Sequence, residues 1–245
     1  MLGRLFGIRV GIHATWIVVF AFVTAVLARG LESIPAATAY GLGALCALVL
    51  FASIVAHELA HALAARGYGV RTGAITLFLF GGIAEIESEP GTPRADALIA
   101  LAGPAMSALI AVAAIAAAFA LDRFAPGTAL AGGIAKLAVY VGLANAVLAV
   151  FNLIPAYPMD GGRVLRAILW ARSRDRRSAT IAAARVGMGF AVLFVAGGVL
   201  AAAALHDVVY TWTAVMGAFL LRQSWTQARA LRAASLPIAE IPAVA

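Results

Sequence analysis

The chain has 245 residues, of which 64% are hydrophobic and only 12% are charged. A soluble domain is ordinarily about half apolar and a quarter charged, so eighteen basic and eleven acidic side chains are too few to give this chain a polar surface, and the composition predicts an integral membrane protein. The formal net charge of +7 does not indicate nucleic-acid binding, because the basic residues flank apolar runs and no recognition module occurs in the sequence.

Six apolar stretches predict six transmembrane helices. A helix needs about 20 mostly apolar residues to cross the hydrocarbon core of a bilayer, and six stretches reach or approach that length: residues 12–28, 39–65, 95–121, 132–153, 179–205 and 208–221. The last is short unless it extends past Arg222 toward Trp225. The first resembles a signal peptide, because Arg4 and Arg9 precede its apolar run. We favour a retained span, because the run is long for a signal.

The basic residues predict the orientation of these spans. With six spans, the N-terminus, the second and fourth loops and the C-terminus share one side, which holds 15 of the 18 basic residues. The other side holds Arg29, Arg123 and Lys136. Basic residues concentrate on the cytoplasmic side of membrane proteins. We therefore expect a multi-pass protein of the cell (plasma) membrane with both termini in the cytoplasm.

The connection between the second and third spans predicts a small β-structure. Residues 75–87 alternate in polarity around Gly81 and Gly82, a pattern typical of a tight β-hairpin that turns at the two glycines. An open sheet edge cannot face lipid. The hairpin is therefore expected at the cytoplasmic interface or inside the protein.

The segment after the fourth span predicts a broken helix. Pro155 and Pro158 lack the N–H donors that a continuous helix needs, and residues 163–172 then form a short basic amphipathic helix suited to the cytoplasmic surface. The predicted fold is thus an all-α polytopic membrane protein with six transmembrane helices, a small hairpin or sheet and one proline-broken helix. Residues 1–230 are expected to form one transmembrane domain, and residues 231–245 a cytoplasmic tail or linker.

The second apolar stretch contains the sequence His-Glu-Leu-Ala-His at residues 57–61. Helical residues four apart differ by about 40° in direction and about 6 Å in rise, so His57 and His61 project from one face. This geometry suits two nitrogen ligands of a tetrahedral Zn²⁺, with Glu58 beside them to take a proton from water. Ionisable groups deep in a membrane are costly unless they are paired or bound. The alternatives are a polar pair that holds helices together, or a proton relay.

A hydrolytic zinc site needs a third protein ligand and one open position. Asp160 is the only acid in the proline-broken segment, and the fourth span runs back toward the side where His57 lies. Gly161 and Gly162 would let the backbone approach the metal closely. The alternative is that Asp160 only caps the helix that begins at Gly161. We favour a ligand, because a cap does not explain the preceding Asn-Pro-Pro context.

The two motifs together closely resemble those of the site-2 protease family of intramembrane zinc metalloproteases. They are HELAH at residues 57–61 and NLIPAYPMDGG at residues 152–162. The resemblance extends to residues 8–16, the Gly-Gly hairpin, Gly103-Pro104 and the run DGGRVLRA, and so covers essentially the whole chain. It implies one Zn²⁺ per chain, a general base, and a polar donor near the substrate carbonyl or its developing oxyanion. The implied metal ligands are His57, His61 and Asp160, the implied base is Glu58, and the implied donor is Asn152.

The sequence departs from the family pattern in three respects. Met159 stands where leucine is usual, a change that conserves side-chain volume. No PDZ-like insertion occurs, and many relatives continue past the last span into a pair of CBS domains. Residues 231–245 are therefore expected to be the end of a minimal member or a linker from a trimmed, longer protein.

The expected function is hydrolysis of a peptide bond in or beside a transmembrane helix, within regulated intramembrane proteolysis. The family resemblance implies a single-span membrane substrate, such as an anti-sigma factor or a membrane-tethered transcription regulator. The hairpin at residues 75–87 offers an edge to which an unwound substrate strand can add. The alternative is a metal or proton transporter with a mid-membrane His/Asp site. Transporters often contain paired halves with matching broken helices, whereas this sequence has one broken segment.

Overall fold

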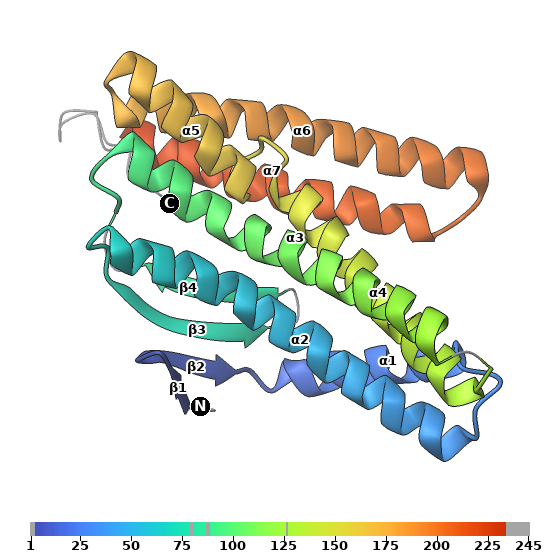
Figure 1. Cartoon of the computed structure of the whole chain (residues 1–245). Coiled ribbons are helices and arrows are strands. Elements are labelled where there is room, and N and C mark those ends of the chain that lie inside the picture. The colour runs from blue at the N-terminus through green and yellow to red at the C-terminus, as the bar shows by residue number, and fades with distance from the viewer. Residues whose placement is uncertain (1–2, 79–80, 87–88, 126, 234–245) are drawn as a thin grey trace. The chain divides into compact units, whose positions relative to one another are not determined.

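The computed structural model describes residues 3–78, 81–86, 89–125 and 127–233, and this part of the chain is mostly helical. Its elements, in chain order, are β1 (Gly3–Leu5), β2 (Ile8–Ile12), α1 (Thr15–Arg29), α2 (Ala36–Gly67), β3 (Thr72–Phe78), β4 (Gly81–Ile86), α3 (Pro93–Phe124), α4 (Ala129–Asn152), α5 (Asp160–Ser173), α6 (Arg176–Leu205) and α7 (Val209–Ala233) (Figure 1). Residues 234–245, most of the expected tail, lie outside the described residues. The division into a domain and a tail stays a prediction.

Four helices of the described chain are long and apolar enough to cross a membrane, namely α2, α3, α4 and α6. They correspond to the second to fifth predicted spans. The first predicted span forms α1, whose 15 residues extend about 22 Å at helical rise, less than the hydrocarbon thickness of about 30 Å. The sixth lies at the start of α7, where Arg222, Gln223 and Ser224 interrupt the apolar run. The membrane class is supported, whereas the count of six spans is not confirmed.

The chain divides into two compact units. The first comprises Met1–Pro90 and Ala102–Phe151, and the second comprises Gly91–Leu101 and Asn152–Ala245. The first unit therefore contains the strands, α1, α2, most of α3 and most of α4. The second contains the start of α3 and all of α5, α6 and α7.

The first unit contains a four-stranded sheet in the order β1-β2-β3-β4. The β1–β2 and β3–β4 pairs are antiparallel, whereas β2 and β3 run parallel. Strands β3 and β4 contact α2, and Ile8, Ile75 and Ala62 form a buried core cluster in this region. Strands β1 and β2 extend the predicted hairpin into a sheet, which alternation alone does not indicate because β1 is only three residues long.

The predicted hairpin is confirmed, but its turn is not at the two glycines. Phe78 pairs with Gly81 and Leu77 pairs with Gly82, so both glycines belong to β4. Residues 79–80, between the two strands, are outside the described residues. Glycine pairs favour turns, but here the observed strand pairing places both glycines in the ladder.

The helices of the first unit approach one another closely at small residues. A Cβ at Gly43 of α2 would lie 2.8 Å from the Thr24 carbonyl oxygen of α1, and one at Gly142 of α4 would lie 3.2 Å from the Ala111 carbonyl oxygen of α3. Small residues at such contacts are typical of helices that pack inside membranes. The apolar core between α1, α2 and α4 consists of Leu27, Ala28, Leu31, Ala39, Cys46, Leu137 and Val141.

In the second unit, α6 and α7 pack side by side and α5 lies against α6 (Figure 1). The predicted break is confirmed, because α4 ends at Asn152 and α5 begins at Asp160. The basic helix expected at residues 163–172 therefore starts three residues earlier. A Cβ at Gly187 of α6 would lie 2.7 Å from the Tyr157 carbonyl oxygen, and the Ser224 hydroxyl of α7 donates a hydrogen bond to that same oxygen. Both contacts hold the broken segment in place.

A buried ion pair joins the start of α3 to α5. Arg166 donates from Nη2 to Asp96 Oδ1 at 2.6 Å and from Nε to Asp96 Oδ2 at 2.8 Å, and Arg163 Nη2 lies 3.4 Å from Asp96 Oδ1. The Asp96 side chain is fully buried. Bidentate arginine–carboxylate pairs of this kind combine strength with fixed geometry, so this contact determines where α5 lies against the first turn of α3.

Replacing Asp96 with alanine is expected to destabilise the second unit. The change leaves the buried Arg166 guanidinium without its carboxylate, a loss of about 3–5 kcal/mol in the free energy of unfolding. Denaturant unfolding in detergent micelles measures this loss. The matched control is Asp122→Ala, which removes an exposed acid near the other end of α3. Equal stability of the two variants would contradict the importance of the ion pair.

Candidate metal centre

The two histidines of the HELAH sequence lie on one face of α2, as their spacing predicts. Their ring centroids are 4.9 Å apart, and the two Nε2 atoms face each other at 3.2 Å. His57 is 3% exposed and His61 is 5% exposed. Two buried imidazole nitrogens therefore converge on one point, which is what a metal ion bound by both would require.

Helix α3 contacts this histidine pair at Gly103. A Cβ built at Gly103 would lie 2.6 Å from His57 Nε2 and closer still to His61 Nε2. Real Cβ atoms do not approach neighbouring atoms so closely, so only glycine allows α3 this near to the imidazoles. In the sequence, Gly103 stands out only through the family resemblance, because nothing in its spacing relates it to residues 57–61.

Ser107 contacts the opposite nitrogen of His57. The Ser107 hydroxyl lies 2.9 Å from His57 Nδ1, within hydrogen-bonding distance, and Ser107 is fully buried on α3. Sequence reasoning does not find this residue. A serine one turn after a Gly-Pro pair in an apolar helix carries no signal of its own, and its partner is fifty positions away in the chain.

Glu58 and Asn152 lie at partly buried positions. Glu58 follows His57 on α2, and Asn152 is the last residue of α4. Both residues take part in interactions within the protein. Their placement agrees with the expected positions on helices, but it does not by itself test the expected roles.

Asp160 is the first residue of α5 and is 8% exposed. The helix starts at Asp160, one residue earlier than expected, and its N-cap is Met159, which makes no side-chain cap hydrogen bond. Whether Asp160 is a ligand or stabilises the helix start stays a prediction. Its carboxylate lies in the first turn, where the helix dipole stabilises negative charge.

The glycines after Asp160 allow close contact with the broken segment itself. A Cβ at Gly161 would overlap the carbonyl oxygens of Leu153 and Ile154, and one at Gly162 would overlap the backbone of Ala156 and Tyr157. The sequence-based expectation assigned these glycines to close approach of the metal. In the structure, the atoms nearest to them belong to the preceding backbone, which they hold against the first turn of α5.

His57, His61 and Asp160, the three ligands that the sequence predicts, are all buried, and each offers one ligand atom that could hold a metal ion. Two imidazole nitrogens and one carboxylate oxygen are the donors found in hydrolytic zinc sites, which keep the fourth position open for water or substrate. Burial of all three residues also fits, because such groups are costly in an apolar interior unless they are paired or bound. The donor set therefore fits Zn²⁺.

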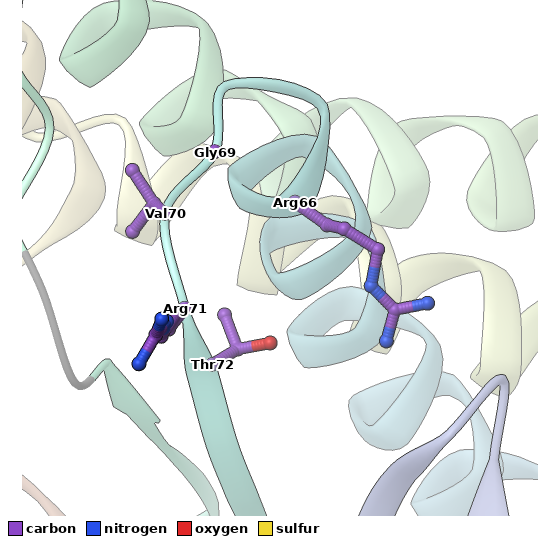
Figure 2. A pocket seen from close by; sticks show the side chains of 5 residues that line it. All are labelled: Arg66, Gly69, Val70, Arg71 and Thr72. Carbon is purple, nitrogen blue, oxygen red and sulfur yellow. The ribbon is translucent and has the colours of Figure 1, made fainter.

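A separate pocket lies at the connection between α2 and β3. Figure 2 shows Arg66 and Arg71 pointing in different directions from this turn, so their guanidinium groups do not converge on one ligand. None of the residues singled out by the two sequence motifs lines this pocket, whose lining residues are Arg66, Gly69, Val70, Arg71 and Thr72. We therefore locate the functional centre at the histidine pair.

Comparison with known proteins finds one matching sequence family and several relatives. The profile of Peptidase family M50 matches residues 45–125 and 120–196, a span that includes the histidine pair and the broken segment. A protein of Synechocystis sp., provisionally named zinc metalloprotease sll0528, is 37% identical over 93% of this chain. A protein of Mycobacterium tuberculosis, provisionally named zinc metalloprotease Rip3, is 39% identical over 89% of this chain.

The match covers 59% of the Synechocystis protein and 56% of the Mycobacterium protein, so the chain spans little more than half the length of these relatives. Among solved structures, the site-2 protease from Methanocaldococcus jannaschii matches with a TM-score of 0.59 and 29% sequence identity. That match covers 93% of this chain and 94% of the other.

Replacing Gly103 with alanine is expected to remove bound metal from the purified chain. The added methyl group would occupy the space next to both Nε2 atoms and turn the imidazoles away from each other. Zinc content per chain, measured by elemental analysis after purification, tests this. Gly41→Ala is the matched control, because Gly41 lies on the same helix as the histidines and an added Cβ there meets nothing within 4 Å. Full zinc content in the Gly103 variant would contradict the proposed position of the site.

Proposed function

The chain belongs to peptidase family M50, the site-2 protease family, and from this membership we propose that it is an intramembrane zinc metalloprotease. It hydrolyses a peptide bond in or near the transmembrane segment of a membrane-anchored protein. The observation that carries the proposal is the buried pair of His57 and His61, whose Nε2 atoms converge within an apolar helix. Metal binding would explain why two imidazoles are buried together at this position.

In this proposal one Zn²⁺ per chain is held by His57, His61 and Asp160, which supply two nitrogen ligands and one oxygen ligand. When bound, the ion activates water for attack and polarises the carbonyl of the scissile bond. Glu58 acts as the general base: its carboxylate accepts a proton from the attacking water and passes that proton to the leaving amine nitrogen. Asn152 donates from its side-chain amide toward the substrate carbonyl oxygen, where negative charge develops during attack.

We further propose that the chain is a multi-pass protein of the cell membrane with six spans and cytoplasmic termini. The four long apolar helices support a membrane location. The distribution of basic residues supports the orientation, because 15 of 18 fall on one side if α1 and α7 also cross. A bilayer thinned near the protein would allow the short helix α1 to span.

The substrates we propose are single-span membrane proteins, such as an anti-sigma factor or a membrane-tethered transcription regulator, cut during regulated intramembrane proteolysis. A helical substrate keeps its peptide bonds in backbone hydrogen bonds, so it must unwind before cleavage. Strand β4 is an outer strand of the sheet, and outer strands can pair with an added extended segment. This supports a role for β4 in receiving the unwound substrate.

Replacing Glu58 with glutamine is expected to abolish cleavage while zinc remains bound. The amide cannot accept the proton, and loss of such a general base costs about 10²- to 10⁴-fold in rate. Cleavage of a co-expressed single-span substrate and zinc content of the purified variant are measured together. Cleavage at the wild-type rate would contradict the protease mechanism. A metal or proton transporter, the alternative, would show ion flux in reconstituted vesicles and no cleavage by the wild-type chain.

A proline in β4 is expected to reduce cleavage of the membrane substrate strongly without loss of zinc. In Ala84→Pro the residue loses its N–H donor, and proline disrupts strand pairing. Ala84→Ser is the matched control, since it changes the same position and keeps the donor. Zinc content separates damage to the metal centre from failure to receive the substrate. Undiminished cleavage by the proline variant would contradict substrate addition at this strand.

A further inference from the structure

The contact between Ser107 and His57 involves the imidazole nitrogen that does not face His61. A neutral imidazole carries one N–H and one lone pair, on different nitrogens. The Ser107 hydroxyl lies 2.9 Å from Nδ1, and His61 Nε2 lies 3.2 Å from Nε2. The two nitrogens of His57 therefore face two different partners. The position of the single ring proton determines which nitrogen donates a hydrogen bond and which one offers a lone pair.

Only one of the two tautomers of His57 allows it to bind a metal at the histidine pair. If Nε2 carried the proton, an N–H group would occupy the direction in which a lone pair is needed. If Nδ1 carries the proton, it donates to the Ser107 hydroxyl oxygen, and the Nε2 lone pair points toward the His61 nitrogen. Histidine ligands of metals generally donate their other N–H to such a partner, which fixes ring orientation and raises ligand basicity.

The surroundings make Ser107 well suited to this task. Ser107 is fully buried, so water cannot readily replace its hydroxyl as the acceptor. It lies one helical turn from Gly103 on the α3 face that meets the histidine pair. Gly103 thus allows α3 to approach the imidazoles, and Ser107, one turn later, supplies the hydrogen-bond acceptor.

We propose that Ser107 is a positioning residue that holds His57 in the Nδ1–H tautomer and thereby increases the affinity of the chain for Zn²⁺. This inference rests on the proposed function, because it requires His57 to be a ligand. Ser107 touches neither substrate nor metal in this scheme. It acts through the orientation and basicity of the His57 ring.

The test compares the zinc affinity of purified wild-type, Ser107→Ala, Ser107→Thr and Ser53→Ala chains by competition with a chelator of known affinity. Ser53 is the matched control: it is buried one turn before His57 on α2, and its hydroxyl donates to the Leu50 carbonyl oxygen of its own helix at 2.7 Å. Circular dichroism establishes that each variant is folded.

Loss of the acceptor is expected to weaken zinc binding about 10- to 100-fold in Ser107→Ala. Threonine keeps a hydroxyl oxygen at the same position, so Ser107→Thr should bind zinc close to the wild-type affinity, and Ser53→Ala should match the wild type. With Co²⁺ in place of Zn²⁺, the visible absorption of Ser107→Ala should also differ from that of the wild type, since the orientation of one ligand changes.

Two results would overturn the inference. One is a Ser107→Ala chain with the zinc affinity of Ser53→Ala, even if its thermal stability is lower, because Ser107 would then only join α2 to α3. The other is an equal loss of zinc affinity in Ser107→Ala and Ser107→Thr. That result would show that packing at this position, and not the hydroxyl group, determines the affinity. A wild-type chain that bound no zinc would instead overturn the proposed metal site itself, so the two failures are distinguishable.

Discussion

The cost of burying polar groups in an apolar interior governs the arrangement of this protein. A buried polar or charged group destabilises a fold unless it is hydrogen-bonded, paired or bound to a metal. Only 12% of the residues are charged, and two buried groups in the described chain show how partners compensate that cost. Asp96 is fully buried and is met by two arginines. His57 is met by Ser107 on one side and His61 on the other. A buried polar group with such partners either stabilises the packing of two helices or belongs to a functional site. An arginine–carboxylate pair is typical of the first, and converging imidazole nitrogens are typical of the second.

Close backbone approach is the second condition, and glycine provides it in both units. At Gly103 the absence of a side chain lets α3 reach the histidine pair, and at Gly161 and Gly162 it lets the broken segment lie against the first turn of α5. Gly187 does the same for α6 against Tyr157. A metal site needs its ligands held in fixed directions. These close contacts restrict the conformations of the backbone that carries the proposed ligands.

Sequence patterns predicted the parts of this fold that depend on local chemistry. The spacing of His57 and His61 determines a shared helical face, and the missing N–H groups of Pro155 and Pro158 predict the interruption between α4 and α5. What could not be predicted depends on contacts between distant segments. Ser107 and Asp96 acquire their roles from partners 50 and 70 positions away, and strand register overrides the turn preference of Gly81 and Gly82. The short helix α1 shows that apolar composition does not fix the length of a helix.

The elements that carry the expected ligands differ from the paired broken helices of a carrier, and this supports the proposed hydrolase. A transporter must release its ion, and such proteins bind at broken helices that move relative to one another. Here both histidines lie within one uninterrupted helix of 32 residues. The residue expected as third ligand begins a helix fixed by the Asp96–Arg166 pair, and the segment before it is held by Ser224. In the proposed function, a zinc site with both imidazole ligands on one continuous helix and one open position would suit repeated activation of water.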